Sequence, residues 1–246
     1  MSAAQARARR GRERRGQVRG GRCPGVVGVV LAGGRGSRMG GDKPRQLLAG
    51  TPLLRYPIAA LARAGLPVAV VTKPGCSLPR PLPPAVRVLR EEDSDHHPLC
   101  GIVHALRTLE AEAIVAVACD MPFVPARLIA ALAATAGVAA VATSSGLAPF
   151  PARWERTCLP HLEEMLARGA SLRTALATAG CRALPFARGV TAGADAFDVT
   201  SGVSLVETAL FDIDTPRDLA RAATLCTAAP TAASAVPQEP VSALSR

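Results

Sequence analysis

A glycine-rich and basic stretch holds the residues of this sequence that are best suited to chemistry. Residues 31–43 read L-A-G-G-R-G-S-R-M-G-G-D-K and follow an apolar run at residues 26–30, which predicts a buried strand. The glycines allow positive φ and close approach to a ligand, and N–H groups exposed on such a loop attract anions. Arg38 and Lys43 add positive charge that binds phosphate. The loop predicts a polyphosphate site. A solvated basic turn is the alternative, because the spacing matches neither standard phosphate fingerprint.

Carboxylates follow several predicted strands. Further apolar strands are predicted at residues 68–72, 86–89, 113–118, 138–143 and 210–214. Glu91, Asp120 and Asp214 stand at or just after the ends of three of them. Because ligands of an open parallel sheet bind outside the carboxyl ends of its strands, these side chains should share one edge with the basic loop. That combination predicts a nucleoside triphosphate with Mg²⁺, which needs only one or two carboxylates beside phosphate and water oxygens.

Helical patterns separate these strands and indicate an α/β fold. Helices are predicted at residues 52–64, 101–109, 125–135, 158–168, 171–179 and 216–225, with a short strand at 152–154. Ser171 and Thr215 are the expected N-caps of two of them. The alternation favours a mostly parallel sheet with helices on both faces. Strands that are apolar throughout agree, because parallel strands are buried on both sides.

Composition and charge narrow the class of protein. Hydrophobic residues make up 49% of 246 residues, yet no apolar run reaches the roughly 18 residues of a membrane span, so no membrane partner is expected. The net charge is +10, but residues 1–24 hold eight Arg against one Glu and so carry seven of those charges. The remainder is mildly basic, and 3% aromatic residues are too few for base stacking, which disfavours a nucleic-acid partner.

The cysteines indicate the redox state of the compartment, and the composition of the two ends of the chain indicates the bounds of the domain. Seven cysteines are an odd number and none forms a C-x-x-C pair, so neither a disulfide framework nor a zinc site is expected, and a reducing cytoplasm is the predicted location. Residues 1–24 and 228–246 have the composition of disordered tails. The first of these is a solubilising tail or the product of a mis-called start codon; the alternative is an arm for nucleic acid or an acidic partner. Residues 25–227 should form one domain.

Several motifs together resemble the nucleotidyltransferase family that includes the molybdenum cofactor guanylyltransferases. They are L-A-G-G-x-x-x-R-M-G-x-D-K from Leu31, G-T-P-L-L from Gly50, P-L-C-G-I from Pro98, C-D-M-P-F from Cys119 and D-I-D-T-P-R-D-L from Asp212. The resemblance covers roughly residues 26–225, and residues 148–154 match only loosely. It implies a single Rossmann-like, three-layer domain of the nucleotide-diphospho-sugar transferase type.

The resemblance also implies roles for matching residues. Nucleotide contacts would come from Leu31, Ala32, Gly33, Gly34, Lys43, Glu91 and Asp120. Arg38, Lys43 and Asp120 would be catalytic, with Asp120 holding Mg²⁺. Asp214, at the end of its predicted strand, is a candidate second ligand. In the implied reaction the terminal phosphate of molybdopterin attacks the α-phosphorus of GTP and releases pyrophosphate. The implied partners are GTP, the molybdenum cofactor and, transiently, cofactor-synthesis proteins and acceptor molybdoenzymes.

Departures from the family pattern keep other activities open. Glu91 replaces an Asp, Thr72 stands where some members have Asn, and Asp212 and Asp214 stand where many guanylyltransferases have Asn. D-I-D-T-P endings also occur in the sister cytidylyltransferases, whereas Gly33 and the Asp-Lys pair favour guanine. Cytidylyl transfer to the same cofactor and nucleotidyl transfer to a sugar phosphate are the alternatives. A catalytically idle GTP-binding accessory protein is a further one.

Overall fold

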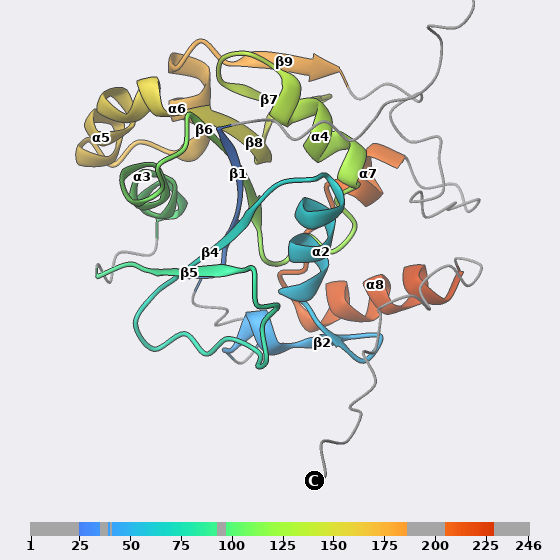
Figure 1. The fold of residues 1–246 in the computed structure, drawn as a ribbon. Helices are drawn as coiled ribbons and strands as arrows, with labels where there is room; N and C mark the ends of the chain where they lie inside the picture. The colour runs from blue at the N-terminus through green and yellow to red at the C-terminus, as the bar shows by residue number, and fades with distance from the viewer. Residues whose placement is uncertain (1–24, 35–38, 40, 93–96, 186–204, 229–246) are drawn as a thin grey trace, which may run out of the picture.

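The computed structural model describes residues 25–34, 39, 41–92, 97–185 and 205–228 (Figure 1). Arg38, residues 1–24 and residues 229–246 lie outside these ranges. A seven-stranded sheet has the order β5 (Arg87–Arg90), β4 (Val68–Thr72), β1 (Val26–Leu31), β6 (Ala113–Ala118), β8 (Gly146–Glu155), β7 (Ala139–Thr143) and β9 (Arg182–Pro185). Every described pairing in it is parallel except the two that β8 makes. The prediction of a mostly parallel α/β sheet is confirmed.

Four parallel strands, β5, β4, β1 and β6, position the polar residues of the sequence at one edge. β4 is buried along its whole length, and β1 and β6 are nearly so. Helices on both faces of the sheet remove water from both sides of β1, β4 and β6, which explains their continuous apolar sequence, whereas the edge strand β5 is largely exposed. All four strands were predicted to within one residue at each end.

The other half of the sheet differs from the prediction at β8. A three-residue strand was expected at residues 152–154, but β8 has ten residues and runs antiparallel between β6 and β7. Pro149 and Pro151 interrupt the apolar alternation that marks a strand in sequence, so only the last residues were recognisable. Trp154 is completely buried at its end and serves packing.

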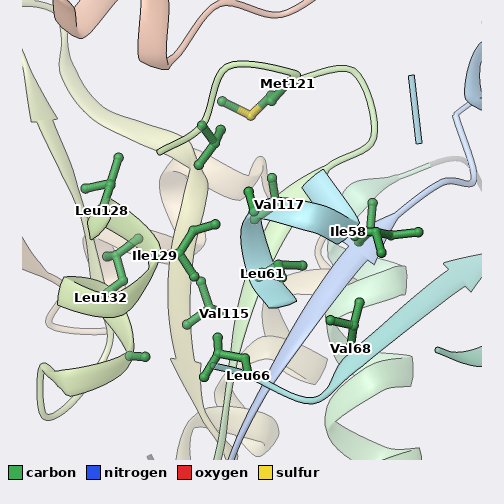
Figure 2. Packing of buried hydrophobic residues seen from close by; sticks show 14 of the residues in the cluster. Ile58, Leu61, Leu66, Val68, Val115, Val117, Met121, Leu128, Ile129 and Leu132 are labelled. Atoms are coloured by element: carbon green, nitrogen blue, oxygen red, sulfur yellow. The ribbon is translucent and has the colours of Figure 1, made fainter. Parts of the chain in front are cut away.

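Helices form one layer on each face of the sheet (Figure 1). α2 (Arg55–Arg63) and α4 (Ala126–Ala134) cover one face, and α3 (Pro98–Thr108), α5 (Leu159–Ala167) and α6 (Leu172–Thr178) cover the other. Figure 2 shows Leu61 and Ile129 meeting Val115 in the first layer. A Cβ on Gly28 would lie 2.6 Å from Leu61, so this glycine allows α2 to approach β1. No helix in the described ranges is both long and apolar enough to cross a membrane.

A small hairpin shortens the helix predicted at residues 52–64. β2 (Leu47–Leu48) and β3 (Thr51–Pro52) pair antiparallel, and α2 begins only at Arg55. Ala49 and Gly50 both have positive φ, 47° and 77°, which is the requirement of a tight two-residue hairpin turn. The hairpin follows directly on the basic loop and gives it an anchor in the fold.

The strand predicted at residues 210–214 is wrong. This segment has no regular secondary structure and belongs to no described sheet, and the Ile213 N–H donates to the Asp120 carbonyl at 3.0 Å. The Ile213 side chain is fully buried in a third apolar cluster with Leu48 and Leu53 from the hairpin region and residues of α8 (Pro216–Ala228). Its apolar pattern therefore reflects packing against α8. Before it lies a short helix, α7 (Leu205–Ala209), which was not predicted.

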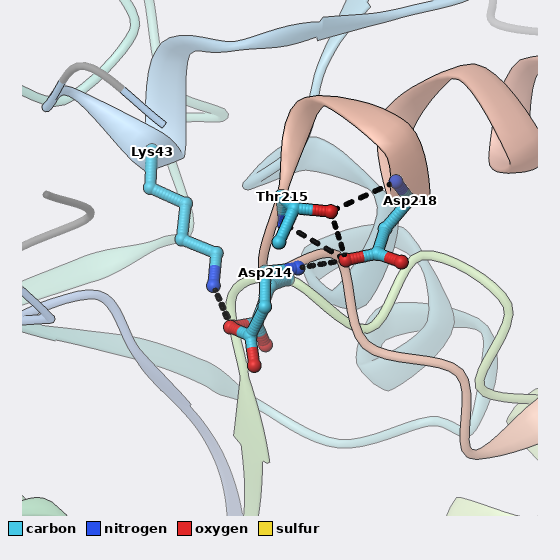
Figure 3. Close-up of polar contacts among 5 residues, drawn as sticks. Lys43, Asp214, Thr215 and Asp218 are labelled. Atoms are coloured by element: carbon cyan, nitrogen blue, oxygen red, sulfur yellow. Dashed lines mark hydrogen bonds and ion pairs between the residues drawn. The ribbon is translucent and has the colours of Figure 1, made fainter. Parts of the chain in front are cut away.

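Reciprocal hydrogen bonds begin α8, as Figure 3 shows. The Asp218 N–H donates to Thr215 Oγ1 at 3.2 Å, and the Thr215 N–H donates to Asp218 Oδ2 at 2.8 Å. This is a capping box, which satisfies N–H groups that have no partner within the helix. The expected caps at Thr215 and at Ser171, which accepts from the Thr174 N–H at 3.1 Å, are both confirmed.

Removing the cap should weaken the fold measurably. Thr215→Ala is expected to lower the free energy of unfolding by about 1 kcal/mol, the usual cost of an N-cap hydroxyl. Thr224→Ala is the matched control, because Thr224 is exposed inside the same helix and its hydroxyl only bonds back to the Ala220 carbonyl. Urea denaturation of both variants measures the difference. Equal losses would show that the cap contributes nothing specific.

Candidate functional site

A cleft of about 1120 Å³ opens at the carboxyl edge of the parallel strands. One wall comes from the loop after β1 and the ends of β4, β5 and β6, and the other from the β7–β8 turn, α6 and the segment after α7. Polar and glycine residues that line it include Gly33, Gly34, Lys43, Lys73, Glu91, Gly101, Asp120, Arg173, Glu207, Asp212 and Asp214. The predicted edge is therefore the location of the cleft.

Lys43 lies at the centre of this cleft. Gly41 and Asp42 have positive φ, 84° and 49°, and turn the chain into a short 3₁₀ helix at Lys43–Arg45. The Lys43 ammonium lies 2.6 Å from Asp120 Oδ2. It also lies 2.7 Å from Asp214 Oδ1 (Figure 3). Only 8% of Lys43 is exposed. Residues from three distant parts of the chain thus meet at one nitrogen.

Opposing effects act on the pKa of Lys43. Burial disfavours the charged form and lowers the pKa, whereas attraction to Asp120 and hydrogen bonds to Asp120 and Asp214 raise it. The net result is a pKa above the ordinary value, because the stabilisation of the ammonium by the two carboxylates exceeds the cost of removing it from water. Lys43 is therefore a permanent ammonium at neutral pH and is suited to holding phosphate oxygens.

Negative charge exceeds positive charge around Lys43. Asp212 also lines the cleft, and its pKa is raised by burial and then by the nearby carboxylates of Asp214 and Asp120. Asp120 Oδ1 is buried and has no hydrogen-bond partner. A buried carboxylate oxygen of this kind fits a hard divalent cation. No three or more His, Cys, Asp or Glu side chains of the described residues converge on one metal position, so substrate oxygens and water would have to complete the shell.

The structure brings most of the predicted site residues to this cleft. Leu31, Gly33, Gly34, Lys43, Glu91 and Asp120 all line it. Ala32 does not: its side chain is fully buried and its N–H donates to the Val71 carbonyl at 2.8 Å. Arg38 lies outside the described residues, and its role stays a prediction. Thr72 is also fully buried behind the cleft wall.

Two cationic residues of the cleft were missed in the sequence. Lys73 follows directly on β4, so its position at a strand end was a usable signal, and it pairs with Glu91 at 2.8 Å. Arg173 lies in α6 and reaches the cleft only because α6 packs beside β8. No local pattern distinguishes Arg173 from a solvated helix residue.

Cys119 stands beside Asp120 but is unsuited to nucleophilic chemistry. It is 5% exposed, and burial raises the pKa of its thiol far above the usual range. Because the thiolate is the reactive form, this thiol is inert at neutral pH. Its burial makes Cys119 a packing residue.

Comparisons with known proteins agree with this geometry. The MobA-like NTP transferase domain matches residues 28–183. A molybdenum cofactor guanylyltransferase of Rhodobacter capsulatus is 33% identical over 204 residues, which cover 80% of this chain and 94% of that protein.

Solved structures share the fold. Molybdopterin-guanine dinucleotide biosynthesis protein A of Archaeoglobus fulgidus is 20% identical, with a TM-score of 0.62 over 82% of this chain and 98% of that one. A Mycobacterium tuberculosis protein crystallised in complex with manganese is 19% identical, with a TM-score of 0.53 over 81% of this chain and 97% of that one. The likeness to both confirms the nucleotide-diphospho-sugar transferase type of fold. The chain belongs to the family of MobA-like NTP transferase domains and is a nucleotidyltransferase.

Proposed function

We propose that this protein transfers GMP from GTP to the phosphate of a molybdopterin-type molybdenum cofactor in the cytoplasm, within a catalytic domain spanning residues 25–227. The observation that carries the proposal is Lys43, held as a buried ammonium between Asp120 and Asp214 directly after the glycine-rich loop. A site of this kind places an ammonium that can hold the triphosphate beside carboxylates that can hold a divalent cation.

One half of the cleft suits the nucleotide. Gly33 and Gly34 line it at the end of β1, and a Cβ on Gly34 would meet nothing within 4 Å, so phosphates can approach the backbone there. Lys43 and, by resemblance, Arg38 supply the positive charge. Glu91 lies toward the edge strand β5, where a carboxylate accepts hydrogen bonds from nucleoside donors and repels phosphate.

Asp120 is the residue that would hold a divalent cation. Its Oδ1 is a buried acceptor without a hydrogen-bond partner, and Asp214 and Asp212 add negative charge beside it. Mg²⁺ bound at Asp120 would polarise the α-phosphoryl group and neutralise the charge of the pyrophosphate that leaves. β6 fixes Asp120 from one side, and the Ile213 N–H holds the Asp120 carbonyl from the other. The carboxylate is thereby oriented before the substrate arrives.

The opposite half of the cleft suits a phosphorylated acceptor. Ser144 and Ser145 in the β7–β8 turn, Phe150 in β8 and Arg173 in α6 line it. Arg173 can bind the acceptor phosphate, and Phe150 offers an apolar face to a ring system. An acceptor phosphate oxygen then bonds to the α-phosphorus of GTP as the bond to the bridging oxygen of the β-phosphate breaks. Cys119 is inert and no covalent intermediate is needed, so catalysis is positioning and charge stabilisation.

The choice of substrates is supported by the family. The curated relative named above is a molybdenum cofactor guanylyltransferase, and Gly33 with Asp42 and Lys43 favours guanine over cytosine. Cytidylyl transfer to the same cofactor is the second candidate, because Asp212 and Asp214 occur in the ending shared with cytidylyltransferases. Nucleotidyl transfer to a sugar phosphate is the third. Cofactor-synthesis proteins and acceptor molybdoenzymes are the proposed transient partners.

Incubation with molybdopterin, Mg²⁺ and each nucleoside triphosphate in turn tests the proposal, with the dinucleotide product identified by mass spectrometry. GTP should be preferred over CTP by at least about tenfold, or ~1.4 kcal/mol. Equal or better use of CTP would replace guanylyl by cytidylyl transfer. Formation of a nucleotide sugar from a sugar phosphate, with no dinucleotide, would support the third candidate. Turnover of none of them would indicate an accessory protein.

Removing the charge of Asp120 should impair metal binding and transfer while the fold is kept. Asp120→Asn keeps the shape of the side chain and is expected to slow transfer on the order of a hundredfold, the scale of one charge-stabilising group. Asp214→Asn should cost much less, because the Asp214 side chain is half exposed. The Mg²⁺ dependence of the rate and the rise of the melting temperature on adding Mg²⁺ with GTP are the measurements.

Glu163→Gln is the control for both variants. Glu163 is a carboxylate in an exposed ion pair with Arg107 and does not line the cleft. This variant should respond to Mg²⁺ like the unaltered protein. Normal activity and normal Mg²⁺ affinity in Asp120→Asn would refute the assignment of the metal ligand.

A further inference from the structure

A second buried ion pair lies in the wall of the cleft, apart from Lys43. Lys73 Nζ lies 2.8 Å from Glu91 Oε2, and the two side chains are only 5% and 4% exposed. They follow the neighbouring parallel strands β4 and β5, and the Glu91 N–H donates to the Thr72 carbonyl at 2.9 Å. The backbone therefore fixes the two residues side by side. Burying both charges is costly, so each depends on the other.

Two glycines make room for this pair. A Cβ on Gly33 would lie 2.7 Å from Lys73 Cγ, and a Cβ on Gly101 would lie 3.0 Å from Glu91 Oε1. Neither glycine has φ in the left-handed region, so the backbone conformation alone does not require glycine there. Glycine is required at both positions because the Lys73 and Glu91 side chains approach so closely. The Lys73 stem crosses the glycine-rich loop, and the Glu91 carboxylate rests against the first turns of α3.

The position of the pair indicates which part of the nucleotide it faces. Asp120 follows β6 and Glu91 follows β5, and the sheet order β5-β4-β1-β6 puts three strand spacings between them, roughly 14 Å at about 4.8 Å each. Phosphates held at Lys43 and Asp120 leave the nucleoside to extend toward β5. A carboxylate there has only acceptor atoms, so it selects donors. Guanine N–H groups and ribose hydroxyls are the two donors that a nucleoside offers.

We propose that Lys73 is a positioning residue that holds the Glu91 carboxylate toward the nucleoside, and that Gly33 is required because it leaves space for Lys73. The inference rests on the proposed function, since it assigns the nucleoside end of the same site. Lys73 acts through Glu91 and contacts no reacting atom. An alanine at position 33 would displace Lys73 and disturb Glu91, which gives a physical cause for a link between Gly33 and the choice of nucleotide.

A comparison of Glu91→Gln with the double variant Lys73→Met/Glu91→Gln tests this dependence. The double variant leaves no buried charge unpaired, so it avoids the folding defect expected of Lys73→Met alone. Each is assayed with GTP, inosine triphosphate, which lacks the guanine amino group, and deoxy-GTP. Glu91→Gln should raise KM for GTP roughly tenfold, the scale of a hydrogen bond to a charged group, with kcat changed less. The double variant should match it.

The ratios of kcat/KM for GTP over each of the two analogues identify which nucleoside group donates to Glu91. Loss of the preference for GTP over inosine triphosphate assigns Glu91 to the base, and loss of the preference over deoxy-GTP assigns it to the ribose. A further large loss in the double variant would show that Lys73 acts independently of Glu91. Lower melting temperatures with unchanged ratios would show a purely structural pair. Either result overturns the proposal. The exposed pair Arg107–Glu163, also 2.8 Å apart, supplies the control variant Arg107→Met/Glu163→Gln, which should alter neither ratio.

The role of Gly33 has its own test. Gly33→Ala should reduce the same nucleotide preference as Glu91→Gln. In a Lys73→Ala background, where that preference is already reduced, Gly33→Ala should add no further loss, because the shorter side chain leaves space for the added methyl group. Gly34→Ala is the matched comparison: any effect that it has should be the same with Lys73 or Ala at position 73. Equal coupling of both glycines to Lys73 would contradict the proposal.

A measurement without catalysis separates this inference from the proposed function. The chain contains only two lysines, Lys43 and Lys73, so [¹³Cε]lysine labelling gives two side-chain NMR signals. Lys73→Arg assigns them. Glu91→Gln should move the Lys73 signal, and GTP with Mg²⁺ should move both signals in the unaltered protein. A response of Lys43 alone refutes the role of Lys73 and leaves the proposed function standing. If neither signal responds to GTP, the proposed function itself fails.

Discussion

The contact between the Lys43 ammonium and the carboxylates of Asp120 and Asp214 is the constraint on which the rest of this site depends. Three acidic side chains gather at one sheet edge, and they repel one another as they lose water. One buried ammonium offsets that repulsion and joins the basic loop, the end of β6 and the start of α8. The apolar cluster that contains Met39, Phe123 and Ile213 packs the same three segments against one another. Charge and packing therefore stabilise one arrangement.

Arginine supplies every other cationic side chain of this sequence apart from the two lysines, and both lysines lie in the cleft. The difference between the two side chains explains this use. An ammonium is compact and directs its donors freely, so Lys43 fits between two carboxylates from different segments, and Lys73 fits under one. A planar guanidinium needs more room and fixed directions. Arg173 lies in the more open half of the cleft.

A nucleotidyltransferase needs no nucleophile of its own, so the main requirement on the protein is this distribution of charge around the substrates. The acceptor supplies the attacking oxygen, and pyrophosphate leaves with its charge neutralised. Accordingly, the cleft holds an inert thiol at Cys119 and no activated nucleophile among the described residues. It presents an unpaired carboxylate oxygen at Asp120, a buried cation at Lys43 and glycines where the chain must come close to the ligand. A rigid parallel sheet provides the precision that such positioning requires.

Local sequence determined the strands β1, β4, β5 and β6, the caps at Thr215 and Ser171, the glycine-rich loop and the presence of Asp120 at a strand end. Each of these depends on residues within a few positions of one another, so periodicity and spacing suffice. Only the tertiary structure decided that Lys43 meets Asp214, 171 residues away, that Lys73 pairs with Glu91, and that Arg173 reaches the cleft. The tertiary structure also decided that residues 210–214 form an irregular segment and not a strand, because Ile213 is buried against α8 and the hairpin region. Contacts between distant segments depend on how the layers pack, and no local pattern of residue types records that.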